Sequence, residues 1–481
     1  MTPRAPTVAP VAPRLVVRGR TLLVALCCLA LLVEVGAWLW FLWRAAHAPV
    51  GQYDFSSYYA AALALRGDPH ANIYSAAVMA RAGAAGHVQV QPPLPYTYPP
   101  LFAILLIPLT FLPFRVAARV WMLVNAGLWV GCTLLLAAEI RRILARATAP
   151  APPALPAPAA APATVGWRRL LEPVTLVALA ISALVCLSFA PAQQTLLTGQ
   201  VDLLVLLPLA LVPRLLRHKR ERWSGAMIAA AAMLKFTPII LLLYFALRRR
   251  WRALVASLVA LLVLGVASIA VVGPGVALNS LTQGLRTGTH DTALGHNEAL
   301  FASVLQQVQA IAPAWEAPAR IAALVLLAAL AVATGLAIAR AGRSAGGGWE
   351  DDGEPGGLVA YCMALCGLLL FAPTAWVHHY VWVLPAATVL LAYCLAGLLR
   401  AAPGERAPWV WRVALALLAT AAVGWMLPYA WDTQPHPHIQ LYHGMSLRPL
   451  FLELRATGTL LLLAIAVSLA SLAPGTRRVA P

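Results

Sequence analysis

Apolar runs long enough to cross a lipid bilayer recur from residue 21 almost to the C-terminus, and they constrain the fold more than any other feature. About 18 consecutive apolar residues with few charges are typical of a transmembrane helix. Such runs fold as helices, because a lipid core offers no water to backbone N–H and C=O groups. Of the 481 residues, 61% are hydrophobic and 11% are charged, whereas soluble domains carry about 25% charged residues. The sequence therefore predicts an all-α, polytopic membrane protein.

The arginines predict the orientation of the chain, because basic loops stay on the cytoplasmic side. They gather at the ends of the apolar runs, so the formal net charge of +18 indicates cytoplasmic loops and anionic lipid rather than nucleic acid. We predict about twelve crossings with both termini in the cytoplasm. The predicted crossings are 21–43, 116–140, 170–190, 201–216, two half-spans within 222–248, 253–272, 320–340, 358–371, 380–399, 410–427 and 447–472.

Interruptions of the apolar pattern predict the organisation between these spans. The proline-rich stretch 96–113 suits an interfacial or half-inserted helix better than a crossing. Lys235 and Pro238 interrupt a run that is basic at both ends, which predicts a re-entrant pair of short helices. The predicted regions are a basic tail at 1–20, a catalytic membrane region at 21–400 with an extracytoplasmic loop at 44–115 and a cytoplasmic Pro/Ala linker at 147–166, and a C-terminal helix pair with an outer loop at 401–481.

An aspartate stands where the chain leaves the first span on the outer side. Asp54 opens the stretch DFSSYYAAALALRG, whose alanines predict a helix that ends near Gly67. Aspartate is a preferred N-cap, and Tyr58 lies one turn later on the same face. On these residues alone, Asp54 is either a helix cap or a general base for a hydroxyl acceptor, and a rigidly held cap is able to serve as both.

Two further features carry ionisable groups into apolar segments. A cation inside a membrane hairpin is costly, so Lys235 is either functional or a lysine that snorkels to the interface. The pair His378–His379 lies where a span emerges outside. Adjacent residues point to different sides of a helix, so we expect only one histidine of the pair to reach a cavity.

Several stretches occur in an order that carries a family resemblance. They are DFSSYYAAALALRGDPHANIY, YTYPPLFAILLIPL, TGQVDLLVLLPLAL, AMLKFTPIILLLYFALRRRWRAL, HNEAL and PTAWVHHYVWVLP. Together they resemble glycosyltransferase family 87, membrane enzymes of the GT-C fold that are similar to the mannosyltransferases of phosphatidylinositol mannoside assembly. The resemblance extends over roughly residues 54–399. It implies inverting transfer of a sugar, with mannose as the first expectation, from a polyprenyl-phosphate donor to a lipid or glycan acceptor, on the extracytoplasmic face of the plasma membrane.

The resemblance also implies roles for particular residues. The acid of the first outer loop, matching Asp54, is the expected catalytic base, and Tyr58 accompanies it as a ligand contact. The positions expected to line the donor and acceptor cavity are Gln200, Asp202, Lys235, Asn297, His378 and His379. The stretch HNEAL departs from the more usual Asn-Gln-Ser pattern, so the sugar contacts beside Glu298 are open. Lys235 or a histidine would stabilise the leaving phosphate. We expect no cofactor and no metal, because the outer loops lack a DxD-like carboxylate pair.

Two other classes of protein fit a polytopic membrane chain. A transporter or lipid flippase without catalytic chemistry would place ionisable groups along several spans as a path. A lipid-linked polymer ligase or polymerase would carry a large arginine-rich loop between late spans. The sequence instead concentrates histidines and a few carboxylates on the outer side, which favours the transferase.

Overall fold

The fold is almost entirely helical in the part of the chain that the computed structural model describes. These residues are 13–47, 53–88, 96–148, 172–290, 297, 299–341, 355–400, 413–414, 417–418, 440–441, 445–446 and 458–468. Within them the only strands are β1 (Gln440–Leu441) and β2 (Met445–Ser446), which pair antiparallel. The all-α prediction is confirmed. The Pro/Ala linker and most of the predicted C-terminal pair lie outside the described residues.

The helices follow one another through short connections. In chain order they are α1 (Pro13–His47), α2 (Tyr53–Gly67), α3 (Ala76–Ala85), α4 (Pro100–Leu106), the 3-10 helix η1 (Ile107–Phe111), α5 (Phe114–Thr148), α6 (Pro173–Leu187), α7 (Ala190–Thr198), α8 (Asp202–Arg217), α9 (Glu221–Leu234), η3 (Thr237–Leu241), α10 (Leu242–Leu247), α11 (Trp251–His290), α12 (Leu300–Ile311), η5 (Pro313–Trp315), α13 (Glu316–Arg340), α14 (Pro355–Leu370), η6 (Val377–Val383) and α15 (Leu384–Arg400). A further helical segment covers Gly458–Ser468.

Among the described residues, five helices are long and apolar enough to cross a membrane. They cover 24–43, 114–148, 251–284, 313–340 and 377–399, and α6 with α7 forms a further candidate that is bent by 58°. The exposed large side chains of α1, α11 and α13 are mainly leucine and valine, as lipid contact requires. The other predicted crossings fall on shorter helices or outside the described residues, so the count of about twelve stays a prediction.

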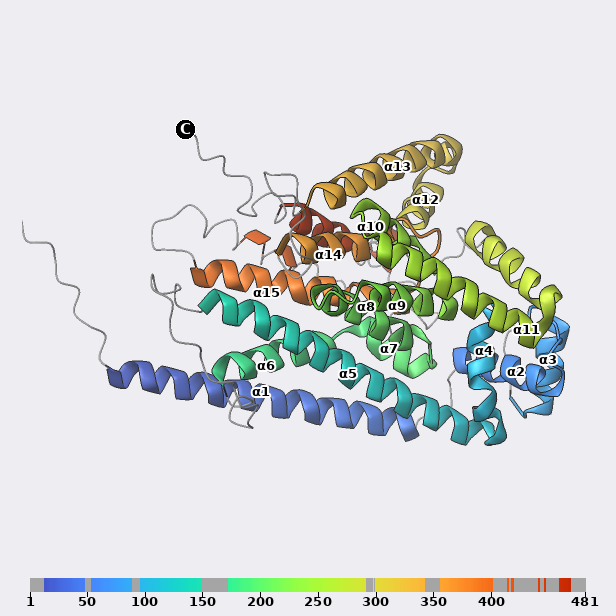
Figure 1. Ribbon diagram of the computed structural model, residues 1–481, viewed down its shortest axis with the longest axis horizontal. Coiled ribbons are helices and arrows are strands. Elements are labelled where there is room, and N and C mark those ends of the chain that lie inside the picture. The colour runs from blue at the N-terminus through green and yellow to red at the C-terminus, as the bar shows by residue number, and fades with distance from the viewer. Residues whose placement is uncertain are drawn as a thin grey trace, which may run out of the picture.

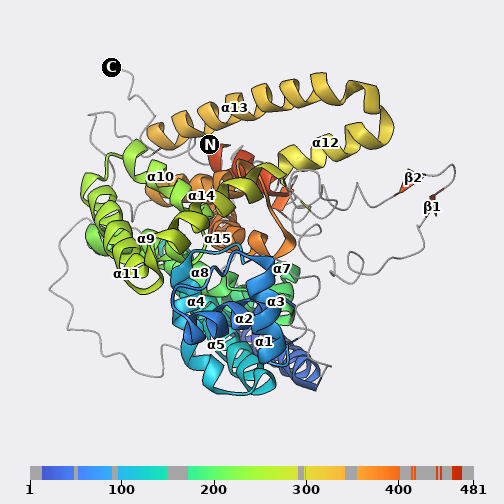
Figure 2. The same cartoon turned by 90° about the vertical axis from the view of Figure 1, so that its right-hand side faces the viewer.

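The long helices pack side by side and carry the outer-loop helices at one end. Helix α6 packs against both α1 and α5, and α15 packs against α5 as well. Helices α2, α3 and α4 gather at the end of this bundle where α5 begins (Figure 1). Helices α12 and α13 form an arm on the side of the bundle away from α1 (Figure 2). As predicted, residues 100–111 form short helices rather than one crossing helix.

The predicted helix pair around Lys235 turns back on itself. Helix α9 ends at Lys235, whose extended backbone (φ −153°, ψ 129°) interrupts the helix before Pro238 starts η3. The chain then returns, so that Arg250 Nη1 lies 3.1 Å from Glu221 Oε1, beside the start of α9. Ser257 on α11 donates a hydrogen bond to the carbonyl of Gly225, also near that start. The hairpin that the two basic ends predict is confirmed, with Lys235 at its tip.

Two stretches between predicted crossings are helical. Residues 190–198 form α7, where Pro191 occupies the first turn, a position at which its missing N–H costs no hydrogen bond. Residues 274–290 continue α11 beyond a kink. At the kink Gly273 takes φ +80°, which favours glycine, and Pro274 starts the second half. In each case a proline stands at the start of a helical segment.

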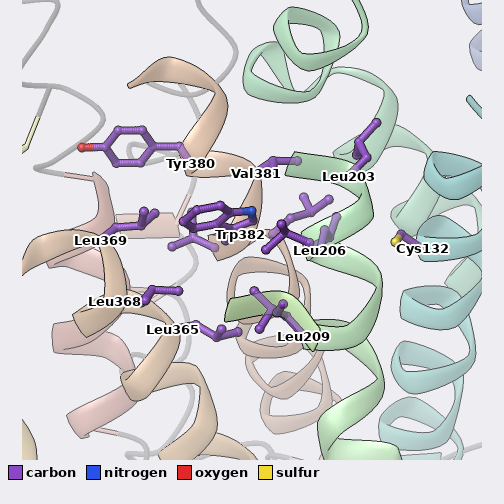
Figure 3. Close-up of a cluster of buried hydrophobic side chains, with 14 of the residues drawn as sticks. Cys132, Leu203, Leu206, Leu209, Leu365, Leu368, Leu369, Tyr380, Val381 and Trp382 are labelled. Atoms are coloured by element: carbon purple, nitrogen blue, oxygen red, sulfur yellow. The ribbon is translucent and has the colours of Figure 1, made fainter. Parts of the chain in front are cut away.

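The core around α8 explains how a helix with internal prolines stays in place. Pro213 lacks an N–H, so the carbonyl of Leu209 loses its helical partner. The hydroxyl of Tyr361 on α14 donates to this carbonyl at 2.8 Å. In Figure 3, Trp382 of η6 lies between the buried leucines of α8 and those of α14. This packing fixes the first turn of α8 against η6.

Candidate functional site

The charged and polar residues predicted for the site come from separate parts of the chain and meet where α2 packs against α7. Asp54 and Tyr58 lie on α2, Gln200 lies between α7 and α8, Asp202 begins α8, and Lys235 lies at the hairpin tip. His378 and His379 join them from η6. The structure therefore brings together every predicted site residue except Asn297.

The turn that carries Gln200 and Asp202 is shaped by local backbone chemistry. Helix α7 ends at Gly199, which takes the left-handed conformation (φ 73°, ψ 29°) typical of a helix C-terminus. The indole N–H of Trp121 donates to the carbonyl of Gly199 at 2.7 Å and pins the turn to α5. Asp202 then occupies the first turn of α8, where the helix dipole favours a carboxylate.

Asp54 lies in the first turn of α2, whose helix already begins at Tyr53. The prediction that Asp54 is the N-cap is therefore wrong, because a cap precedes the first helical residue. The residue as a whole is partly exposed, and its carboxyl is hydrogen-bonded to the side chains of Gln200 and Thr198. Burial raises the pKa of Asp54, while these two hydrogen bonds and the charge of Lys235 oppose the rise. The carboxylate is thus a stronger base than an exposed aspartate.

Two tyrosines complete this part of the site. The hydroxyls of Tyr58 and Tyr98 lie 2.8 Å apart. The Tyr58 hydroxyl also lies 2.5 Å from Gln200 Oε1, so its single proton serves two close contacts, and Tyr98 donates to the same oxygen at 2.9 Å. The rings of Tyr58 and Tyr98 meet edge to face, with centroids 4.9 Å apart. A network of neutral donors therefore links α2, the loop before α4 and the α7–α8 turn.

A buried ion pair forms the second part of the site. Lys235 Nζ lies 3.0 Å from Asp202 Oδ1 and 3.2 Å from Oδ2. Asp202 is fully buried and Lys235 is 8% exposed. The ammonium also lies 5.4 Å from the ring centroid of Tyr98 and 5.3 Å from that of Trp382, within cation–π range. These contacts exclude the alternative that Lys235 snorkels to the membrane interface, because its ammonium lies among the Asp202 carboxylate and the rings of Tyr98 and Trp382.

The histidine pair divides into two roles, as the sequence predicts. His378 faces the ion pair, with Nε2 3.9 Å from Asp202 Oδ2. His379 instead accepts a hydrogen bond at Nδ1 from the backbone N–H of Trp376. Its ring stacks on Trp382, with centroids 5.1 Å apart and planes 9° apart. His378 is the member of the pair that faces the charged groups, and His379 fixes η6 beneath it.

Asn297 holds backbone rather than joining the charged groups. Its Oδ1 accepts hydrogen bonds from the N–H groups of Ala299 and Ala375, each at 3.0 Å. Its Nδ2 donates to the carbonyl of Pro373 at 3.2 Å. These contacts tie the start of α12 to the segment before η6. Glu298 lies outside the described residues.

Three contributors to the site were not identified from the sequence. They are Thr198, Tyr98 and Trp382. The available signal for Tyr98 was its place in the run YTYPP, directly before the prolines that start a short helix. Trp382 had no such signal, since its contact with Lys235 joins segments 147 residues apart (382 minus 235).

The chemistry of this arrangement is that of a partly exposed base beside a buried cation. Asp54 is able to accept a proton, and Lys235 with His378 presents positive charge or N–H groups close by. No group of three or more His, Cys, Asp or Glu side chains suited to a metal ion occurs within the described residues. Metal independence stays a prediction.

The comparisons with known proteins agree on one family. The sequence model of glycosyltransferase family 87 matches residues 96–349. The chain is 32% identical over 349 residues, 71% of this chain and 69% of its relative, to the polyprenol-phosphate-mannose-dependent alpha-(1-2)-phosphatidylinositol mannoside mannosyltransferase of Mycobacterium tuberculosis. It is 29% identical over 361 residues, 71% of this chain and 70% of that relative, to the corresponding pentamannoside mannosyltransferase of Mycolicibacterium smegmatis. No solved structure matches the chain.

Proposed function

Because the chain belongs to glycosyltransferase family 87, we propose that it transfers mannose from polyprenol phosphate mannose to a hydroxyl of a lipid or glycan acceptor. The two relatives named above are polyprenol-phosphate-mannose-dependent and act on phosphatidylinositol mannosides, which makes a glycolipid of that kind the first acceptor to test. The reaction takes place at the extracytoplasmic face, where the arginine distribution puts α2.

The observation that carries the proposal is the position of Asp54 beside the Lys235–Asp202 pair. A glycosyl transfer with inversion needs a base for the acceptor hydroxyl and positive charge for the departing phosphate. The side chains of α2, the α7–α8 turn, the hairpin tip and η6 supply both.

The mechanism assigns each group one task. Asp54 takes the proton of the acceptor hydroxyl as its oxygen attacks the anomeric carbon. The bond between that carbon and the phosphate oxygen breaks, and polyprenyl phosphate leaves with the electron pair. Lys235 and His378 stabilise the charge that develops on this phosphate. The configuration at the anomeric carbon inverts, because attack and departure occur on opposite faces.

Lys235 cannot be judged by a single substitution, because Asp202 would be left buried and unpaired. The double variant Lys235→Met/Asp202→Asn removes both charges and keeps much of the volume. We expect this variant to fold and to bind donor more weakly than the wild type. Unchanged donor affinity would show that the phosphate is held elsewhere.

Activity on a matched donor is the test of the proposed function. Purified protein in detergent is given polyprenyl phosphates that carry mannose, arabinofuranose or glucose, with a phosphatidylinositol mannoside as acceptor. We expect transfer of mannose and little transfer of the other sugars. Transfer of a different sugar would correct the donor. Movement of the donor lipid across vesicles without any transfer would favour the flippase.

The side of the membrane is tested separately, on a background free of native cysteines. A cysteine at Gly67, at the end of α2, should react with an impermeant reagent on intact cells. A cysteine at Gly347 should react only after the cells are opened. The reverse pattern would place the site on the cytoplasmic face.

A further inference from the structure

Gln200 is held in a way that differs from a simple sugar contact. It is 3% exposed, and its Oε1 lies 2.5 Å from the Tyr58 hydroxyl and accepts a hydrogen bond from Tyr98 at 2.9 Å. Tyr58 has one proton for its contacts with Gln200 Oε1 and with the Tyr98 hydroxyl at 2.8 Å. The oxygen end of this amide therefore faces the two phenols.

This arrangement decides which end of the amide meets Asp54. The Asp54 carboxyl is hydrogen-bonded to the Gln200 side chain, and the NH2 group is the end that the phenols leave free. An NH2 group only donates, so it favours the ionised carboxylate. A reversed amide would put its oxygen against the carboxylate oxygen, which is repulsive.

The two tyrosines are themselves fixed. Tyr58 is 2% exposed, and its ring packs edge to face on Phe102, with centroids 5.0 Å apart. The ring of Tyr98 lies against the ammonium of Lys235. Burial raises the pKa of both phenols well above the ordinary value, so both hydroxyls keep the proton that they donate. The orientation of the amide is therefore set by rigid groups.

We infer that Gln200 is a positioning residue, which the hydroxyls of Tyr58 and Tyr98 lock so that its N–H keeps the Asp54 carboxylate ionised and aimed. This inference rests on the proposed function, because it gives the network a purpose only if Asp54 is the base. Tyr98, which was not a site residue in the sequence analysis, takes part by holding the amide oxygen of Gln200.

The pH dependence of transfer separates positioning from substrate contact. Gln200→Leu removes the donor to the carboxylate, so the pKa of Asp54 rises and more of the enzyme is protonated at low pH. We expect the acid limb of kcat/KM to move upward by about one to two pH units, the range for a hydrogen bond to a charged group. Above the limb, much of the activity should return.

Gln193 is a matched control, because it lies on α7, the helix that leads into the α7–α8 turn. Gln193 donates through Nε2 to the carbonyl of Leu187 at 2.9 Å and takes no part in the site. Gln193→Leu removes the same amide by the same substitution. We expect its pH profile to coincide with that of the wild type.

The tyrosines give an independent route to the same result. Tyr58→Phe and Tyr98→Phe each keep the ring and remove one hydroxyl that holds the amide oxygen. We expect each to move the acid limb in the same direction as Gln200→Leu, by less, and the double variant to move it further. These variants carry the test if Gln200→Leu does not fold.

The outcomes distinguish this inference from the proposed function. An acid limb that stays in place, while the KM for donor or acceptor rises, would make Gln200 a substrate contact and overturn the inference. If Asp54→Asn abolishes transfer in that case, the proposed function stands alone. If Asp54→Asn transfers mannose normally, Asp54 is not the base, and the inference fails with that assignment while the proposed mannose transfer stands.

Discussion

Helix α8 carries an acid in its first turn and a base in its last turn, and each forms an ion pair with a different part of the protein. At the first turn, Asp202 is fully buried and contacts Lys235 and, at longer range, His378. At the last turn, Arg217 is partly exposed and binds both carboxylate oxygens of Glu139, at 2.9 and 2.8 Å. Both arrangements agree with the helix dipole.

The difference lies in the balance of charge around each pair. At the Arg217 end, Glu139 also contacts Arg142, so one acid is shared by two arginines. At the Asp202 end, a second acid, Asp54, lies near the same lysine and is held by the uncharged side chains of Gln200 and Thr198. The Arg217 end is thus an ion-paired contact between α8 and α5. The Asp202 end instead keeps the Asp54 carboxylate available for proton transfer.

The largest effect on stability is expected at the buried pair. Lys235→Met leaves Asp202 buried without its cation and should lower the free energy of unfolding by about 3–5 kcal/mol. Thermal unfolding in detergent measures this loss. The double variant Lys235→Met/Asp202→Asn should recover most of it, because no unpaired charge remains. A single variant as stable as the wild type would mean that Asp202 takes up a proton or reaches water.

A smaller effect is expected at the other end of α8. Arg217→Met leaves Glu139 with Arg142 and with partial access to water, so the loss should be about 1–2 kcal/mol, between the values for exposed and buried pairs. Transfer by the folded protein should not change. A loss as large as that of Lys235→Met would contradict the distinction between the two ends.

The smallest effect on stability concerns Asp54 and depends on pH. Burial raises the pKa of Asp54, so the folded state binds this proton more tightly than the unfolded state does. The contribution of Asp54 to stability is therefore complete below its unfolded pKa and falls as pH rises through its folded pKa. Asp54→Asn should be as stable as the wild type or slightly more stable at neutral pH, and this advantage should disappear on acidification. Thermal unfolding of both proteins across acid and neutral pH measures it.

The sequence predicted the elements of the site better than their connections. The apolar runs and the basic ends predicted α1, α5, α8 and the hairpin around Lys235, because hydrophobic length and charge act locally. The same patterns did not predict α7 or the second half of α11, where Pro191 and Pro274 stand at the start of helical segments. The presence of a proline does not by itself tell whether a helix begins or ends at that residue.

The contacts of the site could not be derived from local patterns. Tyr98 reaches Gln200 across 102 positions in the chain, and Lys235 reaches Asp202 across 33. Such pairs depend on how the helices pack, and no periodicity encodes this. The family resemblance supplied Gln200 and Asn297 as cavity residues, but only the packing shows that the oxygen of Gln200 faces two phenols and that Asn297 holds backbone.

The central claim is that Asp54 is the base of a glycosyl transfer, and the turnover of Asp54→Asn tests it most directly. Asparagine keeps the size of the side chain and one acceptor oxygen but cannot take the acceptor proton. We expect Asp54→Asn to fold, to bind polyprenol phosphate mannose as the wild type does, and to transfer mannose at least about a hundredfold more slowly, since general base assistance is worth about 10²–10⁴-fold. Turnover close to that of the wild type, with the same donor and acceptor, would contradict the account.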